Sequence, residues 1–244
     1  GRRPPSRDRP VHPMTTTTAI VALPEASGGW REIELSQPRA WAEHPDAFSS
    51  RVAFAAAHVV ADPRGENVPG APAVIDWETT LAFRQHLFRY GLGVAEAMDT
   101  AQRNMGLDWP AAQELITRSS ALAQEHGARI ASGAGTDQLL APAGSLQEVT
   151  RAYLEQVEFV ETAGSQVIMM ASRHLAALAR SAEDYLQVYS TVLAQASRPV
   201  ILHWLGEMFD PQLSGYWGSI DIPTATRTFL DLINEYSAKV DGVK

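Results

Sequence analysis

Lys239-Val240-Asp241-Gly242-Val243-Lys244 is a stretch typical of a short buried strand, with β-branched valines on both sides of a glycine. The chain contains two lysines, Lys239 and Lys244. Arginine does not lose its proton in a protein, so lysine is the basic side chain that can form an imine with a carbonyl compound. Lys244, directly after the strand, is therefore a candidate catalytic residue, and an ordinary surface lysine is the alternative.

Five apolar stretches of the same kind precede this one. They start at residues 52, 93, 129, 166 and 199, and with the start at 240 the successive starts lie 33 to 41 residues apart. The segments between them show helical periodicity and begin at residues that favour the N-cap position. These N-cap residues are Asp76, Asp108, Ser145 and Ser181. One strand and one helix repeated at this interval are typical of parallel βαβ units.

Two α/β architectures fit such units, an open doubly wound sheet and a closed barrel. No strand is followed by a Gly-x-Gly-x-x-Gly turn, and polar residues follow each strand, which favours the barrel. We predict an α/β fold of the (β/α)8 TIM-barrel class, truncated after about the sixth strand. Residues 51–244 form the barrel with its C-terminal units missing, residues 19–50 an N-terminal extension, and residues 1–18 a disordered tail or vector remnant ahead of the barrel.

The composition argues against several classes of partner. A net charge of -8 and a pI near 5.4 disfavour nucleic acid binding. No apolar run approaches the roughly 18 residues needed to span a bilayer. The absence of cysteine excludes disulfides, thiolate metal sites and a cysteine nucleophile. We expect a cytoplasmic protein that binds neither nucleic acid nor membrane.

Polar residues gather after the predicted strands. They are His58, Glu96, Asp99, Thr100, Thr136, Asp137, Ser172, Arg173, His174, His203 and Lys244. Any one of them is more typical of a helix cap than of a catalyst. Because the carboxyl ends of barrel strands meet at one mouth, their joint occurrence predicts a functional site there.

From about Val74 to Lys244 the chain resembles the dihydrodipicolinate synthase / N-acetylneuraminate lyase family of class I, Schiff-base aldolases, and within it an uncharacterised synthase-like branch. Five segments carry the resemblance: Ile75–Trp77 for the opening helix, Met98–Gln102 for the family's Gly-Thr-Thr-Gly-Glu turn, Gly133–Asp137 for Gly-x-Gly-Ser/Thr-Asn, Pro199–His203 for Pro-x-x-Leu-Tyr, and Val240–Lys244 for Val-x-Gly-Ile-Lys. The last lysine forms the imine in that family.

The chain departs from the family pattern at three places. His203 replaces the family's catalytic tyrosine, and Asp99 replaces the first of two threonines. The segment Ala171–His174 stands where the family has Thr-Pro-Tyr-Tyr. A carboxylate at Asp99 would repel a keto acid unless Arg173 compensates, so a keto sugar becomes the alternative substrate.

The resemblance implies a lyase of the aldolase type, in carbohydrate metabolism, that acts on a small keto acid or keto-sugar derivative without a cofactor. Lys244, with a pKa depressed by burial, forms the imine; His203 moves a proton and Thr100 orients the substrate. The remaining substrate-binding residues are expected to be Asp99, Arg173, Ser172, Glu96, His58 and Thr136. Family members associate as dimers or tetramers, so a homo-oligomer is expected.

Two alternatives stay open. Zn²⁺, Mn²⁺ or Mg²⁺ could bind nitrogen and oxygen ligands at the same mouth and serve a sugar isomerase or metal-dependent aldolase. Those ligands would be His58, Glu96, Asp99, Asp137 and His203. The other alternative is an inactive fragment that needs the missing C-terminal part, because six strands cannot close an eight-stranded barrel.

Overall fold

The computed structural model describes residues 19–37, 51–68, 71–98, 103 and 106–244. The predicted tail at 1–18 lies outside these residues, as do Asp99 and Thr100. The chain divides into two compact units, residues 1–42 and 43–244.

The described part of the first unit is a hairpin. Strands β1 (Ile20–Pro24) and β2 (Trp30–Glu34) pair antiparallel, and Gly28 with φ 84° supplies the left-handed conformation that the connecting turn needs.

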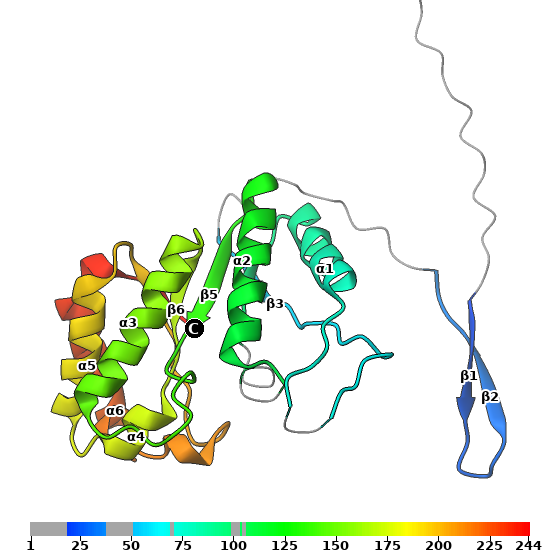
Figure 1. The fold of residues 1–244 in the computed structure, drawn as a ribbon. Helices are drawn as coiled ribbons and strands as arrows, with labels where there is room; N and C mark the ends of the chain where they lie inside the picture. The colour runs from blue at the N-terminus through cyan, green and yellow to red at the C-terminus, as the bar shows by residue number, and fades with distance from the viewer. Residues whose placement is uncertain (1–18, 38–50, 69–70, 99–102, 104–105) are drawn as a thin grey trace, which may run out of the picture. The chain divides into compact units, whose positions relative to one another are not determined.

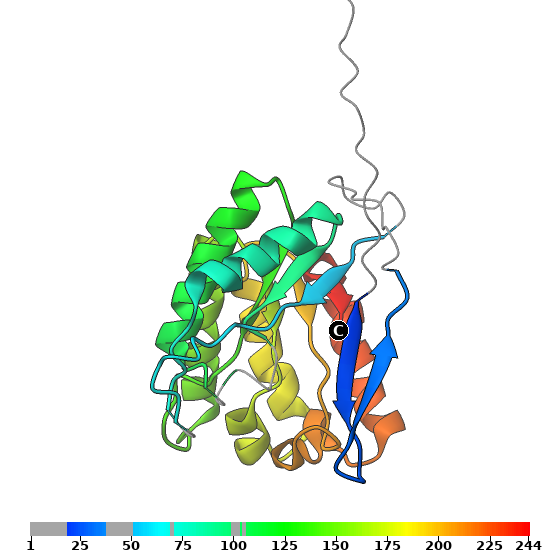
Figure 2. The same ribbon diagram turned by 90° about the vertical axis from the view of Figure 1, so that its right-hand side faces the viewer.

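The second unit contains a six-stranded parallel sheet in sequence order. Its strands are β3 (Phe54–Ala56), β4 (Gly93–Glu96), β5 (Ile130–Ala134), β6 (Gln166–Met169), β7 (Val200–Leu202) and β8 (Val240–Val243). The sheet curls into a half-barrel, with helices between successive strands (Figure 2). The predicted α/β barrel fold through six strands is confirmed.

Helices lie against the sheet, as the labelled ribbon shows (Figure 1). They are α1 (Trp77–Arg89), α2 (Trp109–Glu125), α3 (Leu146–Thr162), α4 (Arg173–Leu178), α5 (Ala182–Gln195) and α6 (Ile222–Glu235), with 3-10 turns η1 (Pro211–Leu213), η2 (Tyr216–Gly218) and η3 (Ser237–Lys239). The predicted N-caps Asp76, Asp108 and Ser145 each accept a hydrogen bond from a backbone N–H of the first turn. None of the described helices is long and apolar enough to cross a membrane.

Successive residues of each strand belong to opposite faces of the sheet. Val94 and Ile130 pack among helix residues, whereas the neighbouring Ala95 and Ala131 belong to a separate cluster with Met98, Ile168 and Met170. This second cluster, made of small residues and flexible methionines, forms the inner face of the half-barrel.

Gly133 of β5 shows how tightly this inner face is packed. A Cβ on Gly133 would lie 2.6 Å from Met170 Sδ, 2.7 Å from the Ala97 carbonyl oxygen and 2.8 Å from Met98 Cβ. Only glycine fits such a close approach, so the ends of β4, β5 and β6 come together at this position.

A buried ion pair fastens the first helix to the sheet. Arg84 of α1 and Glu96 of β4 are both fully buried and form two parallel hydrogen bonds of 2.8 Å. The remaining N–H groups of Arg84 donate to the carbonyl oxygens of Ala57, His58 and Thr80. All five donors of the guanidinium are therefore satisfied, which is the condition under which a buried arginine is tolerated.

We predict that Arg84→Met lowers the free energy of unfolding by about 3–5 kcal/mol, because it leaves the Glu96 carboxylate buried without its ionic partner. The matched variant Arg64→Met removes an exposed pair with Asp62 and should cost less than about 1 kcal/mol. Urea unfolding of the two variants beside the parent chain measures both quantities. Equal, small losses would contradict this role for Arg84.

Candidate functional site

A cavity of about 630 Å³ opens where β5, β6 and β7 end. Its polar lining consists of Arg103, Thr136, Asp137, Ser172, Arg173, His174, His203, Asp210 and Gln212. Leucines, alanines and a proline from the loops after β5, β6 and β7 supply apolar wall. A concave site with a mixed lining at the carboxyl ends of barrel strands is where this architecture carries its chemistry.

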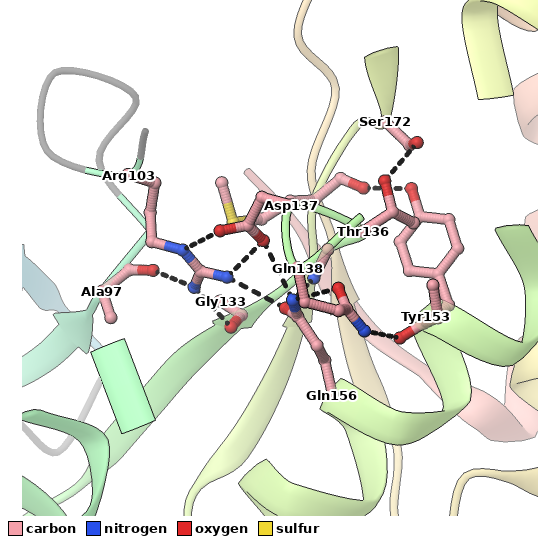
Figure 3. Close-up of polar contacts among 12 residues, drawn as sticks. Ala97, Arg103, Gly133, Thr136, Asp137, Gln138, Tyr153, Gln156 and Ser172 are labelled. Carbon is pink, nitrogen blue, oxygen red and sulfur yellow. Dashed lines mark hydrogen bonds and ion pairs between the residues drawn. The ribbon is translucent and has the colours of Figure 1, made fainter. Parts of the chain in front are cut away.

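One wall of the cavity is a network around Arg103 (Figure 3). Its guanidinium forms a bidentate pair with Asp137, at 2.6 and 2.9 Å, and also donates to Gln156. The last two N–H groups bind the carbonyl oxygens of Ala97 and Gly133, at the ends of β4 and β5. Arg103 thus ties two strand ends and the following turn together.

Gln156 of α3 is the other central member of this network. Its Oε1 accepts from the Gly135 backbone N–H at 2.7 Å, and its Nε2 donates to Asp137 and Gln138. Burial alone would raise the pKa of Asp137, but the Arg103 charge and the hydrogen bonds from Arg103 and Gln156 hold that pKa below its ordinary value. Asp137 is therefore an ionised anchor of the turn after β5.

A chain of hydroxyl groups lies in the cavity wall between β5 and β6. Thr136 Oγ1 is 2.6 Å from Ser172 Oγ and 3.0 Å from His174 Nδ1. Ser172 Oγ also accepts from the Leu175 backbone N–H and so caps α4. Thr136 and Ser172 are buried, and His174 is half-buried.

Three buried tyrosines support this wall from the core. The Ser172 backbone N–H donates to Tyr216 Oη, and Tyr216 Oη lies 3.0 Å from Tyr189 Oη. Tyr153 Oη donates to the Met170 carbonyl oxygen. Burial raises the pKa of Tyr153, Tyr189 and Tyr216, so these phenols keep their protons and act as fixed hydrogen-bonding supports.

Arg173 joins two segments of the rim. Its Nε donates to Asp210 Oδ2 at 2.6 Å, across from the loop that follows β7. Asp210 is buried and also accepts from the Gln212 backbone N–H at the start of η1. The side chain of Arg173 remains 46% exposed, so its charge is partly compensated but still accessible.

His203 follows β7 and is 7% exposed. Among the described residues and their contacts, its Nδ1 is a buried ring nitrogen without a hydrogen-bond partner. Burial, and secondly the positive charge of Lys244, lower the pKa of His203 to about 4. The imidazole is therefore neutral at pH 7, and the residue lines the cavity.

Lys244 follows β8, and its backbone pairs with Leu202 and Trp204 on either side of His203. Its Nζ lies 3.0 Å from the Sδ of Met98, a buried residue of the inner face. The structure departs from the expected burial of the whole residue: Lys244 is exposed, and only its amine reaches the interior. Lys244 directly follows β8, the edge strand of the described sheet.

The other predicted site residues lie elsewhere. Glu96 is held in its pair with Arg84, and the exposed His58 binds Arg84 through its carbonyl oxygen, so neither lines the cavity. Asp99 and Thr100 lie outside the described residues. Of the alternative metal ligands, Asp137 and His203 line the cavity, but the described residues contain no cluster of three acidic or histidine side chains that could hold a metal ion.

Sequence patterns missed Arg103, Gln156 and Asp210, and placed His174 at a strand end without giving it a role. Arg103 directly follows the Met98–Gln102 segment, but that segment assigns it no role, and Gln156 lies in the middle of a helix. A usable signal was present only for Asp210, which precedes a proline at the start of a 3-10 turn and so fits a capping position.

A family model described as "Protein of unknown function (DUF993)" matches residues 21–244, whereas no curated protein matches. The solved structures include dihydrodipicolinate synthase from Oceanobacillus iheyensis, with 16% identity, a TM-score of 0.46, and coverage of 72% of this chain and 58% of that one. L-ribulose 3-epimerase has 15% identity, a TM-score of 0.31, and coverage of 75% and 67%.

The chain thus spans 58% of the length of the synthase. At this identity the likeness concerns the fold alone, and we rest no argument about activity on it. The relationship to Schiff-base aldolases that the motifs indicated stays a prediction.

The depressed pKa of His203 predicts a pH dependence of stability. The unfolded histidine has a pKa near 6.5 and the native one about 4. Between these values the unfolded chain binds more protons, so stability falls as the pH falls. We expect this residue to contribute a loss of about 2–3 kcal/mol between pH 7 and pH 4.5.

Urea unfolding at the two pH values tests this expectation. His203→Gln should show a loss smaller by that amount, whereas His86→Gln, which changes an exposed histidine of α1, should behave like the parent chain. The same pH dependence in the parent and in His203→Gln would contradict the buried, neutral imidazole.

Proposed function

Because the chain belongs to the DUF993 family of proteins of unknown function, we propose its activity from the site: an aldolase-type lyase that holds a small ketone as an imine on Lys244. The observation that carries the proposal is the position of the Lys244 amine. It lies against Met98 on the inner face, beside the neutral imidazole of His203.

Two methionine side chains lie between the Lys244 amine and the cavity. Met98 contacts the Lys244 Nζ, and Met170 lines the cavity. Both would collide with the same Cβ on Gly133, so the two side chains meet at that point. A ketone bound near Met170 and His203 would reach the amine when the flexible Met98 and Met170 side chains move aside.

Imine formation fits these groups. The unprotonated amine attacks the carbonyl carbon, a proton moves from nitrogen to oxygen, and water leaves to give an iminium ion. The net change converts the ammonium form of Lys244 and one ketone into the iminium and one water. His203, whose Nδ1 is an unused acceptor, would carry the proton between nitrogen and oxygen.

The cavity favours a small, hydroxylated carbonyl compound. Its volume of about 630 Å³ is in the range of small-molecule sites. Thr136, Ser172 and His174 offer hydroxyl and imidazole groups, and Arg173 adds a positive charge that Asp210 partly compensates. A keto sugar suits this lining, and a keto acid would depend on Arg173 for its carboxylate.

Reductive trapping tests the proposal. The chain is incubated with dihydroxyacetone or with pyruvate, treated with borohydride, and analysed by intact mass and peptide mapping. We expect one adduct on Lys244 with at least one of the two ketones, because borohydride converts the imine into a secondary amine that stays attached to the protein, whereas free ketone is reduced to an unattached alcohol.

The chain supplies a matched control, since Lys239 is its other lysine. The Lys239 Nζ donates to the Ala196 carbonyl oxygen, away from the cavity. Lys239→Arg should keep the adduct and Lys244→Arg should lose it. Trapping that persists in Lys244→Arg would refute the imine at this residue.

A further inference from the structure

Resting on the proposed function, we infer that His174 is the group that takes the hydroxyl proton of the substrate when the carbon–carbon bond breaks, and that Thr136 and Ser172 position it. His174 lines the same cavity as His203, but it follows β6 instead of β7. The site thereby holds two imidazoles with different surroundings.

The hydrogen bond of His174 decides which ring nitrogen is left to act on a ligand. His174 Nδ1 is 3.0 Å from Thr136 Oγ1, so this nitrogen is bound to the protein wall. The opposite ring nitrogen, Nε2, is then the atom that can exchange a proton with a bound molecule. This is the arrangement in which a second group sets the tautomer of a working histidine.

The hydroxyl chain can adopt two directions. In one, Ser172 donates to Thr136, Thr136 donates to His174 Nδ1, and the proton of the neutral ring is on Nε2. In the other, Nδ1 donates to Thr136, Thr136 donates to Ser172, and Nε2 is a free base. The second direction also provides an acceptor for the Nδ1 proton after Nε2 has gained a charge.

The end of this chain is held rigidly. Ser172 Oγ accepts from the Leu175 N–H, and the Ser172 backbone is bound to the buried Tyr216. With Ser172 fixed, Thr136 has a defined partner on each side. A hydroxyl chain anchored in this way positions His174 without adding a charge to the cavity.

The two histidines would then divide the proton transfers. The Lys244 backbone is hydrogen-bonded to Leu202 and Trp204 on either side of His203, so His203 would serve the carbon and nitrogen atoms of the imine. His174 belongs to the wall on the β5–β6 side, whose hydroxyl groups suit the hydroxylated end of the substrate.

The cleavage step balances with these groups. Nε2 of His174 takes the proton of the hydroxyl group on the second carbon from the iminium, and the released O–H electron pair forms the carbonyl of the aldehyde product. The breaking carbon–carbon bond gives its pair to the enamine, which neutralises the iminium nitrogen. One positive charge passes from the iminium to His174, which returns the proton to solvent.

The test compares two reactions of the full chain: exchange of C–H hydrogens with solvent, and formation of a carbon–carbon bond. Exchange of the dihydroxyacetone C–H hydrogens in D2O needs only the imine and its enamine, whereas addition of the enamine to glyceraldehyde also needs the hydroxyl proton. We expect His174→Gln to lose about 10²–10⁴-fold in addition and to keep exchange and borohydride trapping within about twofold. The exposed His86→Gln serves as the matched control and should keep all three.

A second pair of variants tests the positioning residues. Thr136→Val keeps the shape but removes the hydroxyl, so addition should fall while exchange persists, and Thr136→Ser should restore it. If His174→Gln keeps addition, or loses exchange and addition equally, the inference is wrong even though trapping on Lys244 succeeds. If the parent chain forms no adduct on Lys244 with dihydroxyacetone or pyruvate, the proposed function itself fails.

Discussion

Two buried guanidinium groups hold the strand ends on which the site depends. Arg84 and Arg103 each use all five N–H groups, and each binds backbone carbonyl oxygens as well as a carboxylate. A buried carbonyl oxygen without a partner costs free energy comparable to a lost hydrogen bond. These two side chains therefore satisfy the carbonyl oxygens where β4 and β5 end beneath the cavity. Gly133, which has no side chain, lets Ala97, Met98 and Met170 approach β5 closely.

The same pairing determines what chemistry the cavity can offer. The charges of Arg103 and Arg173 are matched by Asp137 and Asp210, so they serve mainly to build the wall and the rim. The other reactive side chains of the lining are two imidazoles: His203, which is neutral at pH 7, and His174, which is bound to a chain of hydroxyl groups. Such a set suits proton transfer around a carbonyl carbon better than the binding of a strongly charged ligand.

The sequence predicted those features that depend on local patterns. The six strands and the caps at Asp76, Asp108 and Ser145 follow from periodicity and N-cap chemistry, which act over a few residues. The short helix α4 contains too few residues to show a period. The Arg103 network joins residues that lie 34 and 53 positions apart, so only the folded chain reveals it.

Glu96 is the instructive case among the site predictions. A carboxylate inside an apolar strand indicates a buried partner as readily as a ligand, and in the structure that partner is Arg84, 12 residues earlier. For Lys244 the position after the strand was predicted, but the exposure of the residue was not. The exposure of a residue beside the edge strand β8 depends on which segments cover that strand, and local sequence patterns do not show this.

The two lysines of the chain allow a direct spectroscopic test of the central claim. Protein labelled with ¹³C at the lysine Cε positions gives one resonance for each lysine, and Lys239→Arg assigns them. On addition of dihydroxyacetone or pyruvate, without any reductant, the Cε resonance of Lys244 should move to an imine position while that of Lys239 stays in place. Two unmoved resonances at saturating concentrations of both ketones, or a shift of Lys239 alone, would contradict the account.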